Sequence, residues 1–242
     1  MIISHRHKFI FIKTRKTAGT SIELGLSRFC GDDDVLTPMR SESAELKEDA
    51  GHPGARNYKV KLSDMTMRDM AKIPLRGWPA FKGHSDAAYI RSRISDDVWK
   101  NYFVFTFERN PYARALSQFY WNTRKGGTFE GQSIVEHFDN AESFRRSNWG
   151  CYAIDGKVVV DRVYHYETLS DDLADLEKSL KLPGPIVLPK TKTGFRPKAK
   201  KGAKSLPPEM LERVESACAR EIEYFGYGPD DPKPSRLHTN RQ

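Results

Sequence analysis

The hydrophobic positions of this chain fall into short runs separated by polar loops, and the first clear run is Phe-Ile-Phe-Ile at residues 9–12. An unbroken run of β-forming apolar residues indicates a strand that is buried on both faces. A loop of small and basic residues follows at 13–21, and Ile22, Leu24 and Leu26 then continue as a predicted helix. The pattern predicts a central strand, a tight loop and a helix.

A second unit of the same kind follows at residues 103–124. Residues 103–107 are Phe-Val-Phe-Thr-Phe, and Asn110-Pro111 offers a helix N-cap with proline at the first helical position. Further along, the pattern predicts helices at 86–94, at 169–180 and after Ser205, and strands at 158–160 and 163–164. Alternating strands and helices imply an α/β sandwich with a mostly parallel sheet.

Residues 30–79 mix glycine, proline, charges and short apolar pieces without a sustained period. We therefore predict a single domain over 1–242 with an insertion at 30–79, which holds one short helix near 63–72 and lies on the acceptor side. A basic loop is predicted at 189–204, where seven Lys and Arg occur without any acid.

Charge narrows the possible ligands. The 242 residues carry 40 Lys and Arg against 32 Asp and Glu, a formal net charge of +8. Residues 6–16 and 190–204 are both basic and free of acids, which suggests a polyanionic ligand. A nucleic-acid-binding protein is one alternative, although the sequence has no zinc-finger spacing, no aromatic RNA-binding strand and no helix-turn-helix pattern.

Cysteine usage and hydropathy indicate the compartment. The three cysteines, Cys30, Cys151 and Cys218, lie far apart and match no disulfide framework or zinc motif. No run approaches the ~18 apolar residues of a membrane helix, so we expect no membrane span. A reducing cytoplasm fits both observations, and we expect a cytoplasmic protein.

The chemistry is concentrated in Lys-Thr-Ala-Gly-Thr-Ser at residues 16–21. Small residues let the backbone approach an oxyanion, the following helix directs its N–H groups at it, and Lys16 adds a full charge. The hydroxyls of Thr17, Thr20 and Ser21 are further donors. The lysine precedes the glycine, so this is not the GxxxxGK[ST] loop of ordinary P-loop kinases. We predict a phosphate or sulfate cradle.

A second oxyanion site is predicted beside it. Arg109 ends the second strand, and Ser117 lies about two turns along the helix that Asn110 opens. Loops after neighbouring parallel strands meet at one edge of a sheet. Two such sites suit a nucleotide with phosphates at both its 5′ and 3′ positions.

The order of these motifs resembles a known family. Residues 9–12, 16–21, 105–111 (Phe-Thr-Phe-Glu-Arg-Asn-Pro) and 221–227 (Glu-Ile-Glu-Tyr-Phe-Gly-Tyr), together with Arg114 and Ser117, resemble the sulfotransferases that use 3′-phosphoadenosine 5′-phosphosulfate (PAPS). The closest branch is the carbohydrate type, which includes heparan sulfate 2-O-sulfotransferase and bacterial relatives. The resemblance runs from about residue 8 to 227, with 30–79 unmatched, and implies a three-layer sandwich like that of P-loop nucleotide hydrolases.

The resemblance also implies an activity and its residues. The enzyme would move a sulfuryl group from PAPS to a hydroxyl of a carbohydrate or glycan-like acceptor, releasing adenosine 3′,5′-bisphosphate (PAP) without a metal. Lys16 matches the lysine that contacts the 5′-phosphosulfate. The residues that match the loop holding this group are Thr17, Ala18, Gly19, Thr20 and Ser21. Arg109 and Ser117 match the pair that grips the 3′-phosphate.

The loop departs from the family at two positions. Arg15 stands where the family usually has proline, and Lys13 stands where histidine is commoner. The extra positive charge would either tighten donor binding or serve an anionic acceptor.

A general base is expected to take the acceptor's proton. His84, in Gly83-His84-Ser85-Asp86, resembles the histidine that related enzymes place near the acceptor, and a neutral imidazole near pH 7 suits that role. Asp86 is the alternative base, or the partner that orients His84. Stacking on sugar rings is open to Trp78, Trp121 and Trp149, but we expect at least two of them in the core.

Two alternatives from other classes remain. A nucleic-acid-binding protein would show steep salt dependence and no preference for PAP over AMP. A nucleotide phosphotransferase would require magnesium and a carboxylate to hold it, and no acidic site accompanies the Lys16 loop. The sequence favours the sulfotransferase, with no nucleic-acid partner.

Overall fold

The computed structural model describes residues 1–39, 44–45, 48, 51–141, 147–189, 206–230 and 233–239. The basic loop predicted at 189–204 lies outside these ranges, apart from its first residue.

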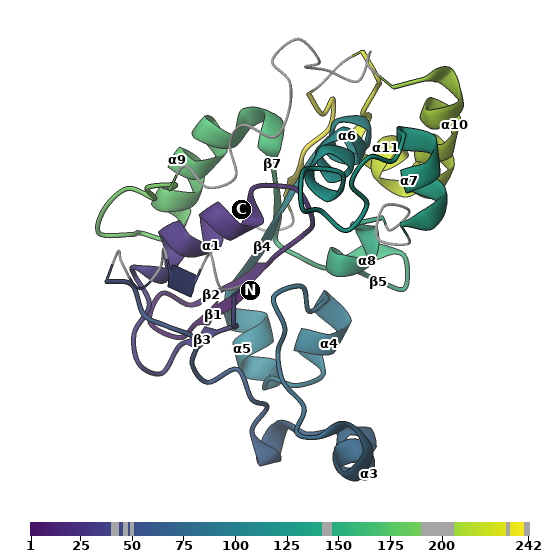
Figure 1. Cartoon of the computed structure of the whole chain (residues 1–242). Helices are drawn as coiled ribbons and strands as arrows, with labels where there is room; N and C mark the ends of the chain where they lie inside the picture. The colour runs from purple at the N-terminus through teal and green to yellow at the C-terminus, as the bar shows by residue number, and fades with distance from the viewer. Residues whose placement is uncertain are drawn as a thin grey trace.

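A six-stranded sheet forms the centre of the molecule, with strand order β3-β1-β2-β4-β7-β8 (Figure 1). Only the three central strands are parallel, β2 with β4 and β4 with β7. The outer pairings, β1 with β2, β1 with β3 and β7 with β8, are antiparallel. The α/β fold is confirmed, but the sheet is mixed and not mostly parallel as predicted, because the short strands β1, β3 and β8 add antiparallel edges. Its parallel part carries both predicted motifs. The strands are β1 Ile2–Ser4, β2 Phe9–Ile12, β3 Val35–Leu36, β4 Phe103–Glu108, β7 Arg162–His165 and β8 His238–Thr239.

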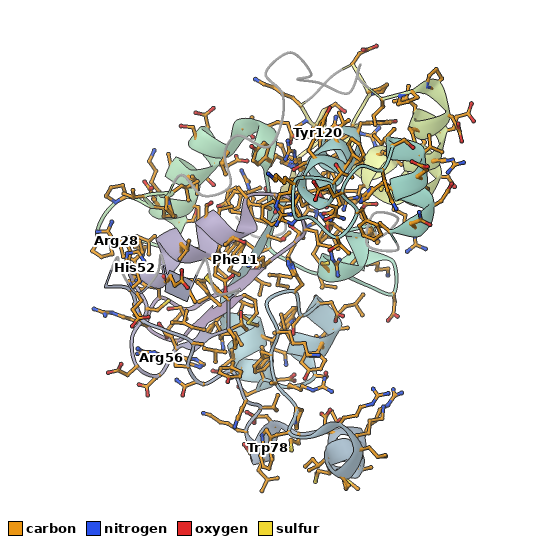
Figure 2. The ribbon with its side chains drawn as sticks, in the orientation of Figure 1. Phe11, Arg28, His52, Arg56, Trp78 and Tyr120 are labelled. Carbon is orange, nitrogen blue, oxygen red and sulfur yellow. The ribbon has the colours of Figure 1, made fainter. Side chains whose placement is uncertain are left out.

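Alternate side chains of the central strands enter two separate cores. Phe9, Phe11 and Phe105 face α1 (Gly19–Ser27) and α9 (Leu169–Ser179), and Figure 2 labels Phe11 where the sheet meets α1. Ile10 and Val104 belong to the core of the opposite face. That face is covered by α4 Ala87–Arg91, α5 Asp96–Asn101, α8 Trp149–Tyr152 and α11 Ala219–Phe225. Helices on both faces confirm the three-layer arrangement, in which a strand must be apolar on both sides.

A third apolar cluster joins α6 (Pro111–Asn122), α7 (Ile134–Asn140) and α10 (Pro208–Ala217). The start of α6 follows from local chemistry, because the Asn110 side chain accepts hydrogen bonds from two backbone N–H groups and proline occupies the first turn. The sequence prediction for this helix is confirmed. The cluster fixes α6 beside the edge of the sheet where β4 ends.

Residues 30–79 are partly built into the fold. They supply β3 at the sheet edge, and then η1 (Leu62–Asp64) and α3 (Met67–Arg76). The single short helix predicted near 63–72 is therefore two elements. Figure 1 shows α3 as an arm at the end of the molecule farthest from α9 and α10.

Three other predicted boundaries differ. The predicted final helix is two, α10 and α11, because Cys218 between them has a non-helical φ of −124°. Of the predicted strand at 158–160, only Val158 lies in a strand, β6 (Lys157–Val158), which pairs with β5 (Ala153–Ile154) in a separate hairpin. The helix predicted at 86–94 is α4, with Asp86 as its N-cap. No helix in the described ranges combines the length and the apolar character that crossing a bilayer requires.

Candidate functional site

The two predicted oxyanion loops meet at one edge of the sheet. β2 and β4 run parallel in register from Phe9 opposite Phe103 to Ile12 opposite Thr106, so both strands end at the same edge. There, the Nη1 group of Arg109 donates a hydrogen bond to the backbone carbonyl of Lys16 at 3.2 Å. The structure thus brings the residues predicted for the 5′ and 3′ groups of a nucleotide into direct contact.

The backbone of the Lys16 loop forms an anion cradle. Lys16 and Ala18 both have φ near 61°, in the left-handed region. Ala18 is the N-cap of α1, and within the described chain no side chain caps this helix. The first N–H groups of a helix have no partner within it, and turns that combine left-handed residues with a helix start present such groups to anions.

Thr17 also has a structural role. Its side chain is fully buried, and its hydroxyl lies 2.9 Å from that of Thr14, which in turn donates to the carbonyl of Phe107. Because the hydroxyl hydrogen of Thr14 is donated to that carbonyl, the hydroxyl of Thr17 is the donor to Thr14. This side chain ties the loop to the end of β4, and binding of the anion by the Thr17 hydroxyl stays a prediction.

Gly19 is required by packing. A Cβ atom at this position would lie 2.8 Å from Cγ of Lys13 and 3.3 Å from the carbonyl oxygen of Thr14. The missing side chain lets the start of α1 pack against the end of β2. The hydroxyl-bearing residues Thr20 and Ser21 follow in the first turn of the same helix.

Lys13 does not add its charge to the cradle. Its Nζ forms a buried ion pair with Glu23 of α1 at 2.7 Å. Burial opposes ionisation of Glu23, but the Met1 amine and Lys13 together lower the pKa of this carboxyl below its usual range. The cations that line the cleft beside the loop are Arg15 and Lys16, with Arg114 across from them.

Asn148 holds the loop from the other side. Its side chain accepts a hydrogen bond from the N–H of Arg15 and donates one to the carbonyl of the same residue, both at 3.1 Å. Its Nδ2 also donates to Glu108 at the end of β4, at 3.0 Å. A single amide therefore fixes the residue that precedes Lys16 and connects it to the strand that carries Arg109.

A buried ionic network supports Asn148. Glu221 of α11 accepts the backbone N–H of Asn148 at 2.8 Å and lies 3.5 Å from Arg114 of α6. Glu108 also accepts a hydrogen bond from Tyr152 at 2.9 Å. Burial raises the pKa of Glu108 to about 7, although the positive charge of Arg114 opposes this shift. The network joins α6, α8 and α11 to the loop and to β4.

Arg109 and Ser117 lie on the α6 side of the site. The Arg109 guanidinium stacks on Tyr166, with its central carbon 4.0 Å from the ring centroid. Ser117 is partly buried on α6, next to Gln118, which lines the cleft together with Lys16 and Arg114. Arg109 is therefore in direct contact with the Lys16 loop, whereas Ser117 is placed on α6 and its contact with the nucleotide stays a prediction.

His84 approaches the loop from α4's side of the sheet. Its Nδ1 lies 2.8 Å from the backbone carbonyl of Lys13. A carbonyl only accepts, so Nδ1 carries the hydrogen and Nε2 keeps its lone pair. His84 is exposed as a whole residue, but partial desolvation of its ring, together with the positive charges of Lys13 and Arg15, lowers its pKa. The imidazole is neutral near pH 7, in the tautomer that leaves Nε2 free to accept a proton.

Asp86 is occupied elsewhere. Its carboxylate accepts the N–H of Tyr89 at 2.7 Å as the N-cap of α4. Its geometry is that of a helix cap, two residues after His84.

One tryptophan borders the site. Trp121 on α6 lies under the Nζ of Lys16, 4.9 Å from the ring centroid, and under Arg124 at 3.6 Å. Trp149 is in the core, but Trp78 is 47% exposed and Trp121 is only partly buried. The expectation that at least two of these three lie in the core is wrong.

Sequence reasoning missed Asn148, Glu108 and the position of Trp121. Glu108 had a signal, because a carboxylate at the end of an otherwise apolar strand must be buried with partners. Asn148 lies in a stretch without motif or period, and its partner Arg15 is distant in sequence. Within the described ranges, no group of three or more His, Cys, Asp or Glu side chains is arranged to hold a metal ion.

Comparison with known proteins decides the family. The model of the sulfotransferase family matches residues 1–228. The chain belongs to the sulfotransferase family. This confirms the resemblance at the level of the family, and with it an enzyme that is a PAPS-dependent transferase with a P-loop-like α/β fold.

The other comparisons say little about the acceptor. An uncharacterized protein of Archaeoglobus fulgidus is 33% identical over an alignment of 104 residues that covers 39% of this chain and 80% of that protein. No solved structure matches the chain. The acceptor of this sulfotransferase therefore has to be argued from its own residues.

Proposed function

We propose that this sulfotransferase moves the sulfuryl group of PAPS to a hydroxyl of a carbohydrate or glycan-like acceptor by in-line transfer. The observation that supports it best is the contact at the sheet edge, where the Arg109 guanidinium lies 3.2 Å from the carbonyl of Lys16. One edge thus offers cationic and N–H groups for phosphates at both ends of a nucleoside, which is the distinctive feature of PAPS.

Each part of the donor has a set of residues suited to it. Lys16 and the backbone N–H groups at the start of α1 suit the 5′-phosphosulfate, because they combine a full charge with main-chain donors at the positive end of a helix whose N-cap residue, Ala18, makes no side-chain cap. Thr20 and Ser21 add hydroxyls in the same turn. Arg109 and Ser117 suit the 3′-phosphate, for which the planar guanidinium offers two parallel donors.

The chemistry requires charge stabilisation and one proton transfer. During transfer, the bond from sulfur to the bridging phosphate oxygen breaks as a bond from sulfur to the acceptor oxygen forms, and negative charge grows on the leaving phosphate. Lys16 and the N–H groups of the loop stabilise that charge. Nε2 of His84 takes the proton of the acceptor hydroxyl, and the Lys13 carbonyl keeps the ring in the required tautomer.

Two residues beside the cradle, Trp121 and Arg124, bear on the acceptor. A partly buried indole beside Lys16 offers an apolar face on which the C–H groups of a sugar ring can pack. Arg124, stacked on the same ring, adds a positive charge for acidic substituents. An indole packs against sugar rings and aromatic rings alike, so it is the charge of Arg124 that supports an acidic carbohydrate over a small neutral phenol.

Transfer of radioactive sulfate from 35S-labelled PAPS tests this proposal. The acceptors are neutral oligosaccharides, uronic-acid-containing oligosaccharides and a simple phenol, and the variants are Lys16→Ala and Trp121→Ala. Lys157→Ala, which removes an exposed lysine of β6, is the matched control. We expect labelled oligosaccharide with wild type and the control, and at least a tenfold loss in both site variants. Label on the phenol alone would overturn the carbohydrate assignment.

A further inference from the structure

Helix α3 exposes an apolar face that the sulfotransferase site does not use. All ten residues of α3 are described, and none of them is buried. Met67, Met70, Ala71, Pro74 and Leu75 follow the i, i+3, i+4, i+7, i+8 spacing of one helix face, and Trp78 extends it just beyond the end. Met67 is 81% and Leu75 85% exposed. Leu62 of the adjacent η1 is also exposed.

This face is held rigidly at the end of the molecule. Thr66 and Asp69 form a capping box, and Asp69 also makes an ion pair of 2.6 Å with Arg93. Ile73 packs against the main core, and the Trp78 indole donates to the Val60 carbonyl at 2.8 Å. The inner side of α3 is therefore fixed, and its outer side stays apolar. Figure 1 shows α3, and Figure 2 shows the labelled Trp78, at the protruding end of the molecule.

A row of cations runs along the border of the apolar face. Arg68, Lys72 and Arg76 are spaced four residues apart and so lie on one side of the helix. They are close enough that Arg68, above all, and Arg76 lower the pKa of Lys72. The acid of the helix, Asp69, is paired with Arg93. Lys59 and Lys61 are exposed on the adjoining segment.

We propose that α3 and η1 form a docking surface for an anionic lipid membrane. Exposed apolar side chains bordered by Lys and Arg, with a tryptophan at the edge, are the composition of helices that lie in the membrane interface. The row of cations complements anionic headgroups, while the apolar side chains enter the boundary between headgroups and acyl chains. The α3 arm protrudes from the rest of the molecule (Figure 1), so a flat, deformable bilayer can reach its outer side. The proposal is independent of the acceptor assigned above.

Flotation with lipid vesicles tests the surface. Wild-type protein is mixed with vesicles of phosphatidylcholine alone and with vesicles that contain 30% phosphatidylglycerol, a test composition, at low and high salt. We expect flotation with the anionic vesicles and at least a fivefold loss at high salt, because headgroup attraction is screened. Absence of flotation with anionic vesicles, or equal flotation with both compositions, would overturn the proposal.

Matched variants locate the contact. Leu75→Glu places a charge in the apolar face, and Arg68→Gln/Lys72→Gln/Arg76→Gln removes the row of cations. The control for the first variant is Leu237→Glu, because Leu237 is 66% exposed and lies outside α3. The control for the second is Lys157→Gln/Lys178→Gln/Arg220→Gln, which removes three exposed charges outside α3. We expect at least a fivefold loss of flotation in the α3 variants, near wild-type flotation in the controls, and unchanged PAP binding in all four. Equal flotation of the α3 variants and their controls would contradict the membrane proposal. So would a wild-type dimer that binds no lipid and that the Leu75→Glu substitution converts to a monomer.

Discussion

At the scale of single residues, the site depends on side chains whose orientation is set by one or two hydrogen bonds. The carbonyl of Lys13 fixes the tautomer of His84, and the ion pair with Glu23 removes Lys13 itself from the cradle. Lys16 is left as the loop's cation toward Trp121. Of the two basic residues that depart from the family pattern, Lys13 thus stabilises the fold, whereas Arg15 lines the cleft together with Lys16.

Replacing His84 separates turnover from donor binding. In His84→Ala the proton acceptor is lost, so we expect kcat to fall about 10²- to 10⁴-fold, which is the usual contribution of a general base. PAP affinity should remain within about twofold, because Lys16, Arg109 and the loop are untouched. The comparison uses steady-state transfer assays and calorimetric titration with PAP, and His84→Ala with wild-type kcat would exclude this residue as the base.

The titration of His84 offers an independent check. The lowered pKa means that the ring of the free protein stays neutral as pH falls through 6.5 and gains its proton only near pH 4. NMR titration of the His84 ring, assigned with His84→Ala, is expected to show no change between pH 7 and 5. A midpoint near 6.5 would show that neither desolvation of the ring nor the charges of Lys13 and Arg15 hold it neutral, and would contradict the lowered pKa.

At the scale of elements, local chemistry was predictable and long-range pairing was not. The Asn110-Pro111 start of α6 and the leucine spacing of α9 follow from residues within one or two turns, and the structure confirms both. Strands β1, β3 and β8 are two or three residues long, too short for a period, and β8 exists because His238 pairs with Val163 across the chain. The Lys16 loop was predictable for the same local reason, whereas its support by Asn148 was not.

Asn148 should control the geometry of the Lys16 loop. Asn148→Ala removes both hydrogen bonds to Arg15 and leaves Glu108 with one fewer buried donor, a change of about 1–3 kcal/mol. We expect PAP to bind about tenfold more weakly and kcat to fall as well, because a displaced loop serves the transition state less well than the ground state. Asn101→Ala, on the surface of α5, is the control, and it should change neither quantity.

A further variant distinguishes a positioning role from a merely structural one. Asn148→Asp keeps the shape and the acceptor toward Arg15 but places a carboxylate against Glu108, so we expect the loss of PAP affinity to deepen as pH rises past 7. Affinity of Asn148→Ala and Asn148→Asp equal to wild type at every pH would show that the loop does not need this clamp.

At the scale of the whole molecule, three layers bury several neutral histidines, and this makes stability depend on pH. His165 and His137 are almost completely buried, and burial lowers the pKa of His165 to about 3 and that of His137 to about 4. The unfolded chain binds protons at these positions near pH 6.5, and the folded chain does not. Protonation therefore favours unfolding as pH falls from 6.5 toward 4, while the raised pKa of Glu108 acts in the opposite direction.

His165→Gln should weaken this pH dependence. Each pH unit below 6.5 costs the folded protein up to about 1.4 kcal/mol for a histidine held neutral, and the glutamine variant lacks that contribution. Urea unfolding at pH 7, 6 and 5 is expected to give a free energy that falls more steeply in wild type than in His165→Gln. Parallel curves would show that His165 accepts a proton in the folded state.

The central claim is that one sheet edge binds both phosphate ends of the donor nucleotide, and calorimetric titration with PAP tests it most directly. AMP, which lacks the 3′-phosphate, and ATP with magnesium are the ligand controls, and Lys157→Ala is the protein control. We predict that PAP binds, that AMP binds at least tenfold more weakly, and that Lys16→Ala and Arg109→Ala each lose at least tenfold in PAP affinity. Equal affinity for PAP and AMP, or binding of ATP with magnesium alone, would contradict the assignment of Lys16 and Arg109 to the two ends of PAPS.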